Sequence, residues 1–350
     1  MDFTFSEEQR MMAGALRTLT DDICAGAELR RIFDGSDSAA PERWQRLAEM
    51  GLFGVFAPQE LGGLGLSDAD FVLLAEEVGR AALPEPLIEQ AAVAVPALCE
   101  LADTPALTAL ASSAVRGESR IAVLHPQCEL ANVPPDATHW LLCEGAAVRV
   151  FAAAEVSPRA QRSIDAGRRL YALEVPAGAA GIIAQGERAR MITARAGNRG
   201  ALYAAAQCLG LAERMLALAV GYAKERVQFG RPIGSYQAIK HQLANVAVKL
   251  EFARPVVYAA AARVTGLDAQ SYAAVSHAKL AAGDAADLAA RTAIQVHGAM
   301  GYSWELDLHF FMKRAWALQG AWGDRNFHAR RVQSLVCDGA LALGPEETFA

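Results

Sequence analysis

The residue types that most often do chemistry are thinly spread through this sequence. Its six cysteines lie far apart and form no C-x-x-C pair: Cys24, Cys99, Cys128, Cys143, Cys208 and Cys337. No histidine stands at metal-ligand spacing from them, so the sequence predicts neither a zinc site nor a disulfide framework. The formal charge of -6 argues against nucleic-acid binding, which needs a dominant basic face. Any anionic ligand must therefore be bound by local positive groups.

The remaining composition indicates a globular protein in a reducing compartment. The 350 residues are 53% hydrophobic, enough for two or three domain cores. The first residues, MDFTFSEEQRMM, include acidic side chains and no long apolar run, so we expect no secretory signal. No stretch reaches the roughly 20 uninterrupted apolar residues of a membrane helix. We expect a cytoplasmic protein that contacts neither membrane nor nucleic acid.

Three segments of different periodicity must position any site. Residues 1–118 have a helical pattern, interrupted by the loop APQELGGLGLSD, and Ser67 or Asp68 is placed to cap the helix that follows it. Residues 119–187 hold short β-like runs: RIAVLHP, THWLLCEG, AVRVFAA and RLYALEV. Helical periodicity returns in residues 188–350. The sequence predicts a mainly α protein with an N-terminal helical domain, a small β domain and a C-terminal four-helix bundle.

The bundle segment contains three long apolar stripes. One includes Leu209 and Leu216, the next Leu243 and Leu250, and the third is built mostly from alanines between positions 275 and 296. Small side chains let neighbouring helix backbones approach closely. After the first stripe, Gly230 and Pro232 predict a helix end, and Ser235 predicts the N-cap of the next helix.

Three motifs in this order make nearly the whole chain resemble the acyl-CoA dehydrogenase family. They are PQELGGLGLSDADFVLLAEEVGR (58–80), YAKERVQFGRPIGSYQAIKHQLANVAVKLEFAR (222–254) and QVHGAMGYSWELDLHFFMKR (295–314). The resemblance implies an acyl-CoA substrate, FAD bound between subunits of a homo- or hetero-oligomeric dimer of dimers, and electron-transfer flavoprotein or a similar acceptor.

The same resemblance implies two groups of flavin-binding residues, which would serve FAD on a neighbouring subunit. The first group would reach the pyrophosphate and adenine side: Arg226, Val227, Gln228 and Gln237. The second would form the loop that receives the adenosine half: Gln295, Val296, His297, Gly298 and Ala299, where Ala299 replaces the usual second glycine. A guanidinium binds pyrophosphate through two parallel hydrogen bonds, and a glycine lets backbone groups come near a ligand.

Each of these residues has an ordinary structural interpretation. Taken singly, Gly298 is more typical of a helix cap, and Arg226 of a solvated helix residue. Gln237 would be a surface amide, and His297 a hydrogen-bonded structural histidine. Only their joint spacing favours the flavin interpretation.

The catalytic base implied by the resemblance is missing. In the family, a glutamate after the third bundle helix, in a Y-E-G-T context, removes the α-proton of the thioester while the β-hydrogen leaves as hydride to the flavin. In this chain ALQGAWGDRNFHARR places Trp322 at that position, and the alternative base position at the start of the first bundle helix is Gly200. Asp324 is the nearest carboxylate, although beside Arg325 it is also typical of an ion-paired loop residue.

Other features also match the small partner subunits of heteromeric bacterial acyl-CoA dehydrogenases. The first β run is followed by AVLHPQCELANVPPDA instead of the family's T-E-P-x-A-G-S-D loop, and WGDRNFH is similar to that subgroup's F-G-D-x-x-x-H. Three hypotheses remain open at this stage. The chain is a subunit that works with a base-bearing partner, a self-sufficient dehydrogenase that uses Asp324, or a non-catalytic scaffold.

Overall fold

The computed structural model describes residues 4–37, 40–175, 180–341 and 344. Helices occupy the first part of the chain: α1 (Glu7–Ile23), α2 (Ala27–Asp34), α3 (Ala40–Glu49), α4 (Asp68–Arg80), α5 (Val95–Glu100) and α6 (Pro105–Val115). A π-helical segment, η3 (Ile88–Ala94), leads into α5. Ser67 is the N-cap of α4 and forms a reciprocal capping box with Asp70. Of the two caps that the sequence predicted, Ser67 and Asp68, the first is therefore correct.

Two small sheets follow. The first has the strand order β1 (Ile121–Leu124), β3 (His139–Cys143), β4 (Ala147–Ala152) and β7 (Ile182–Gln185). Its β1–β3 pair is parallel, with Ile121 opposite His139, and its other pairs are antiparallel. The second sheet is antiparallel and has the order β2 (Ala131–Asn132), β6 (Leu170–Leu173) and β5 (Pro158–Gln161). All four predicted β runs form strands, namely β1, β3, β4 and β6.

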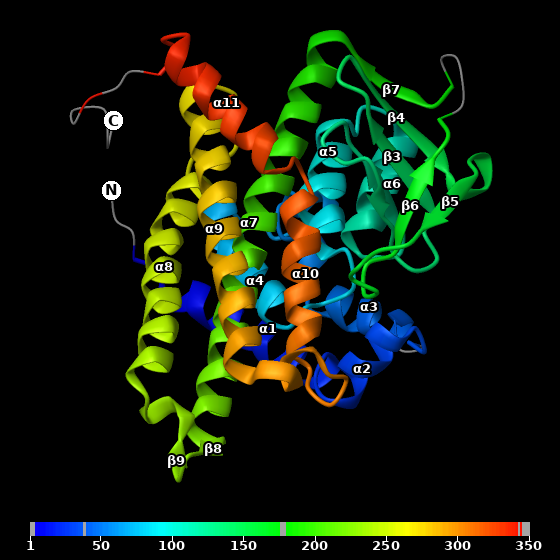
Figure 1. Ribbon diagram of the computed structural model, residues 1–350. Coiled ribbons are helices and arrows are strands. Elements are labelled where there is room, and N and C mark those ends of the chain that lie inside the picture. Colours follow the sequence, from blue (N-terminus) through cyan, green and yellow to red (C-terminus); the bar gives the residue numbers. More distant parts are fainter. Residues whose placement is uncertain (1–3, 38–39, 176–179, 342–343, 345–350) are drawn as a thin grey trace.

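The C-terminal bundle contains α7 (Gly186–Glu225), α8 (Gln237–Ala261), α9 (Ala269–His297) and α10 (Leu308–Gly320), and α11 (Arg325–Cys337) crosses its top in Figure 1. The mainly α fold with a small β domain is therefore confirmed. Helix α7 starts two residues before the predicted segment boundary at 188. By length and composition it would pass as a membrane span, but 61% of its apolar window is buried inside the protein, as in a core helix.

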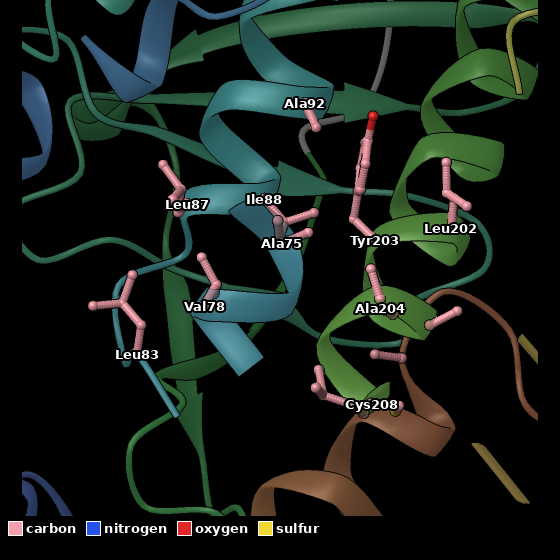
Figure 2. Packing of buried hydrophobic residues seen from close by; sticks show 14 of the residues in the cluster. Ala75, Val78, Leu83, Leu87, Ile88, Ala92, Leu202, Tyr203, Ala204 and Cys208 are labelled. Atoms are coloured by element: carbon pink, nitrogen blue, oxygen red, sulfur yellow. The ribbon is translucent and has the colours of Figure 1, made fainter. Parts of the chain in front are cut away.

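Helix α7 is the centre of the core. It packs against α4 and η3 on one side and against α9 on the other. Figure 2 shows Tyr203 and Ala204 of α7 facing Ala75 and Val78 of α4 across this contact. The backbones of α4 and α7 nearly touch, because a Cβ added to Gly210 would lie 1.9 Å from the carbonyl oxygen of Glu76. A side chain at this crossing would force the two helices apart.

The turn between α7 and α8 differs from the prediction. Helix α7 ends at Glu225, and Gly230 lies instead in a hairpin between β8 (Val227–Gln228) and β9 (Arg231–Pro232). The two-residue loop Phe229–Gly230 has φ values of +51° and +79°, the signs that a type I′ turn requires. Ser235 is also not the N-cap of α8, because Tyr236 holds that position and the Ser235 hydroxyl donates to the Pro232 carbonyl.

Candidate functional site

The two positions expected to hold a catalytic base lie in contact. The Trp322 side chain is buried, and a Cβ added to Gly200 on α7 would lie only 2.1 Å from its Cδ2 atom. The indole therefore fills the space beside Gly200. Neither an indole nor a glycine accepts a proton from a substrate carbon.

Hydrogen bonds hold the Trp322 loop, which joins α10 to α11, in one conformation. Trp322 has a φ of +58°, a region that bulky residues rarely adopt. The buried Lys279 ammonium donates to the carbonyl oxygens of four loop or helix-end residues: Leu318, Gln319, Ala321 and Gly323. These bonds satisfy carbonyls that the end of α10 leaves free and stabilise the loop against the bundle. Burial lowers the pKa of Lys279 to about 8.

A second chain of hydrogen bonds reaches the carbonyl of Trp322 itself. Arg331 Nε donates to Ser276 Oγ at 2.7 Å, so the serine hydroxyl is free to donate to His328 Nδ1 at 3.0 Å. His328 Nε2 then carries the proton and donates to the Trp322 carbonyl oxygen at 3.0 Å. Burial lowers the pKa of His328 to about 3, which keeps this ring neutral. The backbone of Trp322 is thereby fixed by α9 and α11 together.

The interior behind Trp322 is small and charged. A space of about 20 Å³ is bordered by Trp322, Gln207 and the buried carboxylates Glu85 and Glu89. Burial raises the pKa of Glu85 to about 7 and also raises that of Glu89. A space of this size holds at most about one water molecule. It accommodates no apolar acyl chain.

The charges around this space are paired across domains. Arg43 of α3 donates to Glu85 at 2.8 Å, and Arg314 of α10 pairs with Asp165 of the β domain. Arg314 also donates to the Leu83 carbonyl at 2.6 Å. Such pairs are costly to break, because one charge would remain buried without a partner.

Asp324 does not have the geometry of a base. Its Oδ1 accepts the backbone N–H of Phe327 at 2.7 Å, so it is the N-cap of α11. The expected ion pair with Arg325 is wrong, because Arg325 pairs with Asp284 of α9. The Asp324 side chain is exposed and borders a cleft outside Trp322.

That cleft, of about 400 Å³, separates the β domain from the corner between α10 and α11. Cys128 and Glu129 line it from the loop after β1, and Arg168 lines it from the β domain. Within the described part of the chain, the Arg168 side chain makes one hydrogen bond, of 3.4 Å, to the Ala317 carbonyl oxygen.

The first group of predicted flavin-binding residues lies at the far end of the bundle. The side chains of Arg226, Val227, Gln228 and Gln237 are exposed on the β8–β9 hairpin and at the start of α8. Arg226 and Gln237 make no side-chain hydrogen bond or ion pair with the described part of the chain. Gln228 Nε2 donates to the Val227 carbonyl at 2.6 Å, so its amide is partly used.

The second group lies at the same end. Successive bundle helices run antiparallel, so α7 and α9 point the same way and their last turns lie at the same end (Figure 1). There Tyr222 stacks on His297 with ring centroids 4.2 Å apart. Gln295, Gly298 and Ala299 are exposed. Val296 and His297 are buried, and His297 Nδ1 bonds to the Ala293 carbonyl at 2.8 Å. Their side chains cannot reach a ligand, so only their backbone groups remain available.

This end of the bundle fits the nucleotide half of a flavin. A free guanidinium, free amides and the exposed Gly298 backbone, with φ of +62°, stand within one solvent-facing region. Pyrophosphate and adenine need such cationic and amide donors. The structure places at one end of the bundle two groups of residues that lie about 70 positions apart in the sequence.

Sequence reasoning missed three features of the site. Nothing in the sequence showed that Trp322 contacts Gly200, although both were singled out. Neither the buried carboxylates Glu85 and Glu89 nor Lys279, which lies in the alanine-rich stripe of α9, was singled out from the sequence. A lysine inside an otherwise small-residue stripe was the one available signal. Among the described residues no cluster of three or more histidine, cysteine or carboxylate side chains is placed to hold a metal ion.

Comparisons with known proteins agree with the fold. Residues 6–102 match the acyl-CoA dehydrogenase N-terminal domain and residues 190–335 the C-terminal domain. The chain is 33% identical over 317 residues to acyl-CoA dehydrogenase IpdE2 of Mycobacterium tuberculosis, covering 88% of this chain and 91% of IpdE2. It is 29% identical to IpdE2 of Mycolicibacterium smegmatis, covering 95% and 99%.

A solved structure supports the same assignment. A chain of the ChsE4–ChsE5 complex from Mycobacterium tuberculosis superposes with a TM-score of 0.82 and 25% identity, covering 97% of this chain and 99% of that one. The two family matches cover more than half of the sequence and flank the small β domain. This chain belongs to the acyl-CoA dehydrogenase family.

Proposed function

We propose that this chain is the base-lacking subunit of a heteromeric, FAD-dependent acyl-CoA dehydrogenase. It would bind the nucleotide half of a flavin whose ring and acyl-CoA site belong to a second, glutamate-bearing chain. The observation that carries the proposal is the contact between Trp322 and Gly200, which fills both expected base positions with groups that cannot accept a proton. When bound, the flavin supplies the hydride acceptor for α,β-dehydrogenation of the thioester.

The chain's own residues would bind and orient the cofactor. Arg226 would pair with the pyrophosphate, and the positive end of the α8 dipole, at Gln237, adds to the local attraction for phosphate. Gln295 and the backbone of Gly298 would contact the adenosine half. Orientation matters because a misplacement of about an ångström costs roughly a hundredfold in rate.

Titration calorimetry on the isolated chain tests this role. ADP should bind, FMN should not, and FAD should bind weakly. Arg226→Gln should weaken ADP binding by about tenfold to a hundredfold, as expected for one charge-assisted hydrogen bond. Arg190→Gln is the matched control, because Arg190 is also exposed on α7 but lies at its other end, paired with Glu187. Binding of FMN in preference to ADP would contradict the proposal.

Turnover by the isolated chain tests the missing base. Mixed anaerobically with FAD and a panel of acyl-CoA thioesters, the chain should not bleach the flavin band near ~450 nm. Robust reduction by the homo-oligomer would refute the partner-subunit role.

One observation favours a second candidate, a self-sufficient dehydrogenase. Asp324 borders the 400 Å³ cleft and keeps a carboxylate oxygen that the N-cap bond does not use. In that case Asp324→Asn, which preserves the cap, would abolish turnover while flavin stays bound. We favour the partner-subunit role, because the buried indole of Trp322 fills the space beside Gly200.

A further inference from the structure

The cleft beside Asp324 has the size of a small-molecule site. Its volume of about 400 Å³ lies within the range of about 300–1,000 Å³ in which proteins bind organic ligands. In the proposed function the flavin ring belongs to the partner subunit, so this cleft has no part in that reaction. The chemistry of its walls therefore has to indicate what it binds.

One cation in the cleft lacks a carboxylate partner. Within the described residues the half-buried Arg168 guanidinium forms no ion pair, and its hydrogen bond to a carbonyl oxygen is 3.4 Å long. The neighbouring arginines are paired. Arg169 lies 3.5 Å from Asp37, and Arg314 pairs with Asp165. A guanidinium with free donors in a half-buried place favours an anionic group that can accept two parallel hydrogen bonds.

The nearest buried acid does not compensate this charge fully. Arg168 also borders the inner space that contains Glu89. Burial raises the pKa of Glu89, although the Arg168 charge acts in the opposite direction, and the two side chains form no ion pair. The Arg168 charge thus remains available to a ligand in the outer cleft.

The walls around Arg168 are mainly apolar. Side chains from the β domain and from the α10–α11 corner contribute to them: Leu130, Leu170, Ala317, Ala321 and Phe327. Burial raises the pKa of Cys128 to about 11, so the thiol that also lines the cleft is neutral. Such walls favour a ligand with an apolar body, because binding removes nonpolar surface from water.

Two carboxylates at the rim restrict the charge of the ligand. Glu129 and Asp324 border the cleft and are exposed to solvent. They would repel a dianionic phosphate, whereas a single negative charge held at Arg168 meets less repulsion. A monocarboxylate therefore fits the cleft better than a phosphate ester does.

We propose that this cleft binds a monocarboxylic acid with an apolar body. Arg168 would hold the carboxylate, and the body would lie against Leu130, Leu170 and Phe327. This ligand site goes beyond the proposed function and is separate from the nucleotide-binding end of the bundle.

Titration calorimetry of the purified chain with 2-naphthoate tests the site. The neutral 2-naphthamide has nearly the same shape and should bind about tenfold to a hundredfold more weakly, as expected when a charge-assisted hydrogen bond is lost. The dianionic 2-naphthyl phosphate should also bind more weakly than 2-naphthoate.

Substitution of the cation separates its charge from the apolar walls. Arg168→Gln should weaken 2-naphthoate binding by about tenfold to a hundredfold and leave 2-naphthamide binding nearly unchanged. Arg168→Lys should restore part of the lost affinity, because the positive charge returns without the planar fork. Arg159→Gln is the control, since Arg159 is exposed on β5 and does not border the cleft.

A substitution that fills the cleft gives a second readout. Gly320 ends α10 and borders the cleft, its φ is not positive, and no atom lies within 4 Å of an added Cβ. Gly320→Leu should therefore fold normally and weaken binding of both naphthalene probes at least about tenfold. Gly14→Leu is the matched control, because Gly14 is exposed on α1 and also has no atom within 4 Å of an added Cβ. Equal unfolding temperatures would show that both variants fold.

The opposite outcomes are equally clear. Equal affinities for 2-naphthoate and 2-naphthamide, tighter binding of the phosphate, or binding that Gly320→Leu does not weaken would each overturn the assignment. Lumiflavin that binds in preference to 2-naphthoate, and is blocked by Gly320→Leu, would overturn it in favour of a flavin ring. No binding of any probe also overturns it, while ADP binding by the same preparation decides the nucleotide role separately.

Discussion

The contact between Trp322 and Gly200 predicts an unusual response to a single methyl group. Alanine normally stabilises a helix interior by about 0.5–1 kcal/mol relative to glycine. Gly200→Ala should instead destabilise the protein by about 1–3 kcal/mol, because the new Cβ would lie 2.1 Å from the buried indole. Gly221 is the matched control, since it lies in the same helix with nothing within 4 Å of an added Cβ.

A double-mutant cycle isolates the contact. Trp322→Gly suits the φ of +58° and removes the clash, although the lost burial should cost roughly 3 kcal/mol. In that background Gly200→Ala should become stabilising, which gives a coupling energy of about 1.5–4 kcal/mol between the two sites. Urea unfolding followed by far-UV circular dichroism measures each free energy. Equal stabilisation by Gly200→Ala and Gly221→Ala in the unaltered chain would refute the filled-pocket reasoning.

Three further predictions concern the framework of the site. Lys279→Met should lower the free energy of unfolding by about 3 kcal/mol, because carbonyls at the end of α10 and in the loop that follows it lose their shared ammonium donor, and an unchanged urea midpoint would contradict this. Ser67→Ala should cost about 1 kcal/mol, whereas Ser67→Asn, which keeps a polar capping side chain beside the Asp70 carboxylate without adding a second charge, should cost less when the two are compared by thermal unfolding. Burial raises the folded-state pKa of Glu76 to about 7, so the native state binds more protons than the unfolded state between its ordinary pKa and about pH 7. The free energy of unfolding should therefore fall as pH rises through that window. Glu76→Gln should make this decrease smaller when the free energy is measured by urea titration at each pH. A part of the decrease should remain, because the pKa of Glu85 is also raised to about 7.

The fold was predictable because its signals are local. Alternation in short runs gave β1, β3, β4 and β6, and alanine spacing gave the stripe of α9. The hairpin was missed because Gly230 and Pro232 serve a helix end and a tight turn equally well. Only the pairing of Gln228 with Arg231, a property of two strands together, distinguishes them.

The site was predictable as a set of positions but not as a geometry. The resemblance predicts that Trp322 and Gly200 stand at the two base positions, yet their contact depends on the packing of α7 against a loop 122 residues away. The burial of Val296 and His297 likewise follows from the last turn of α9 facing Tyr222. Side-chain direction at a helix end depends on the neighbouring helix, which no single-sequence pattern encodes.

The nucleotide role is tested most directly by the structure of the assembled, flavin-loaded complex. The proposed function predicts that the Arg226 guanidinium and the Gln295 amide lie within about 3 Å of the ADP half of a flavin whose ring is held by the other subunit. Trp322 should still cover Gly200. A map in which Arg226 and Gln295 face bulk solvent, or in which the flavin ring sits beside Asp324 of this chain with its own acyl pocket open, would contradict it.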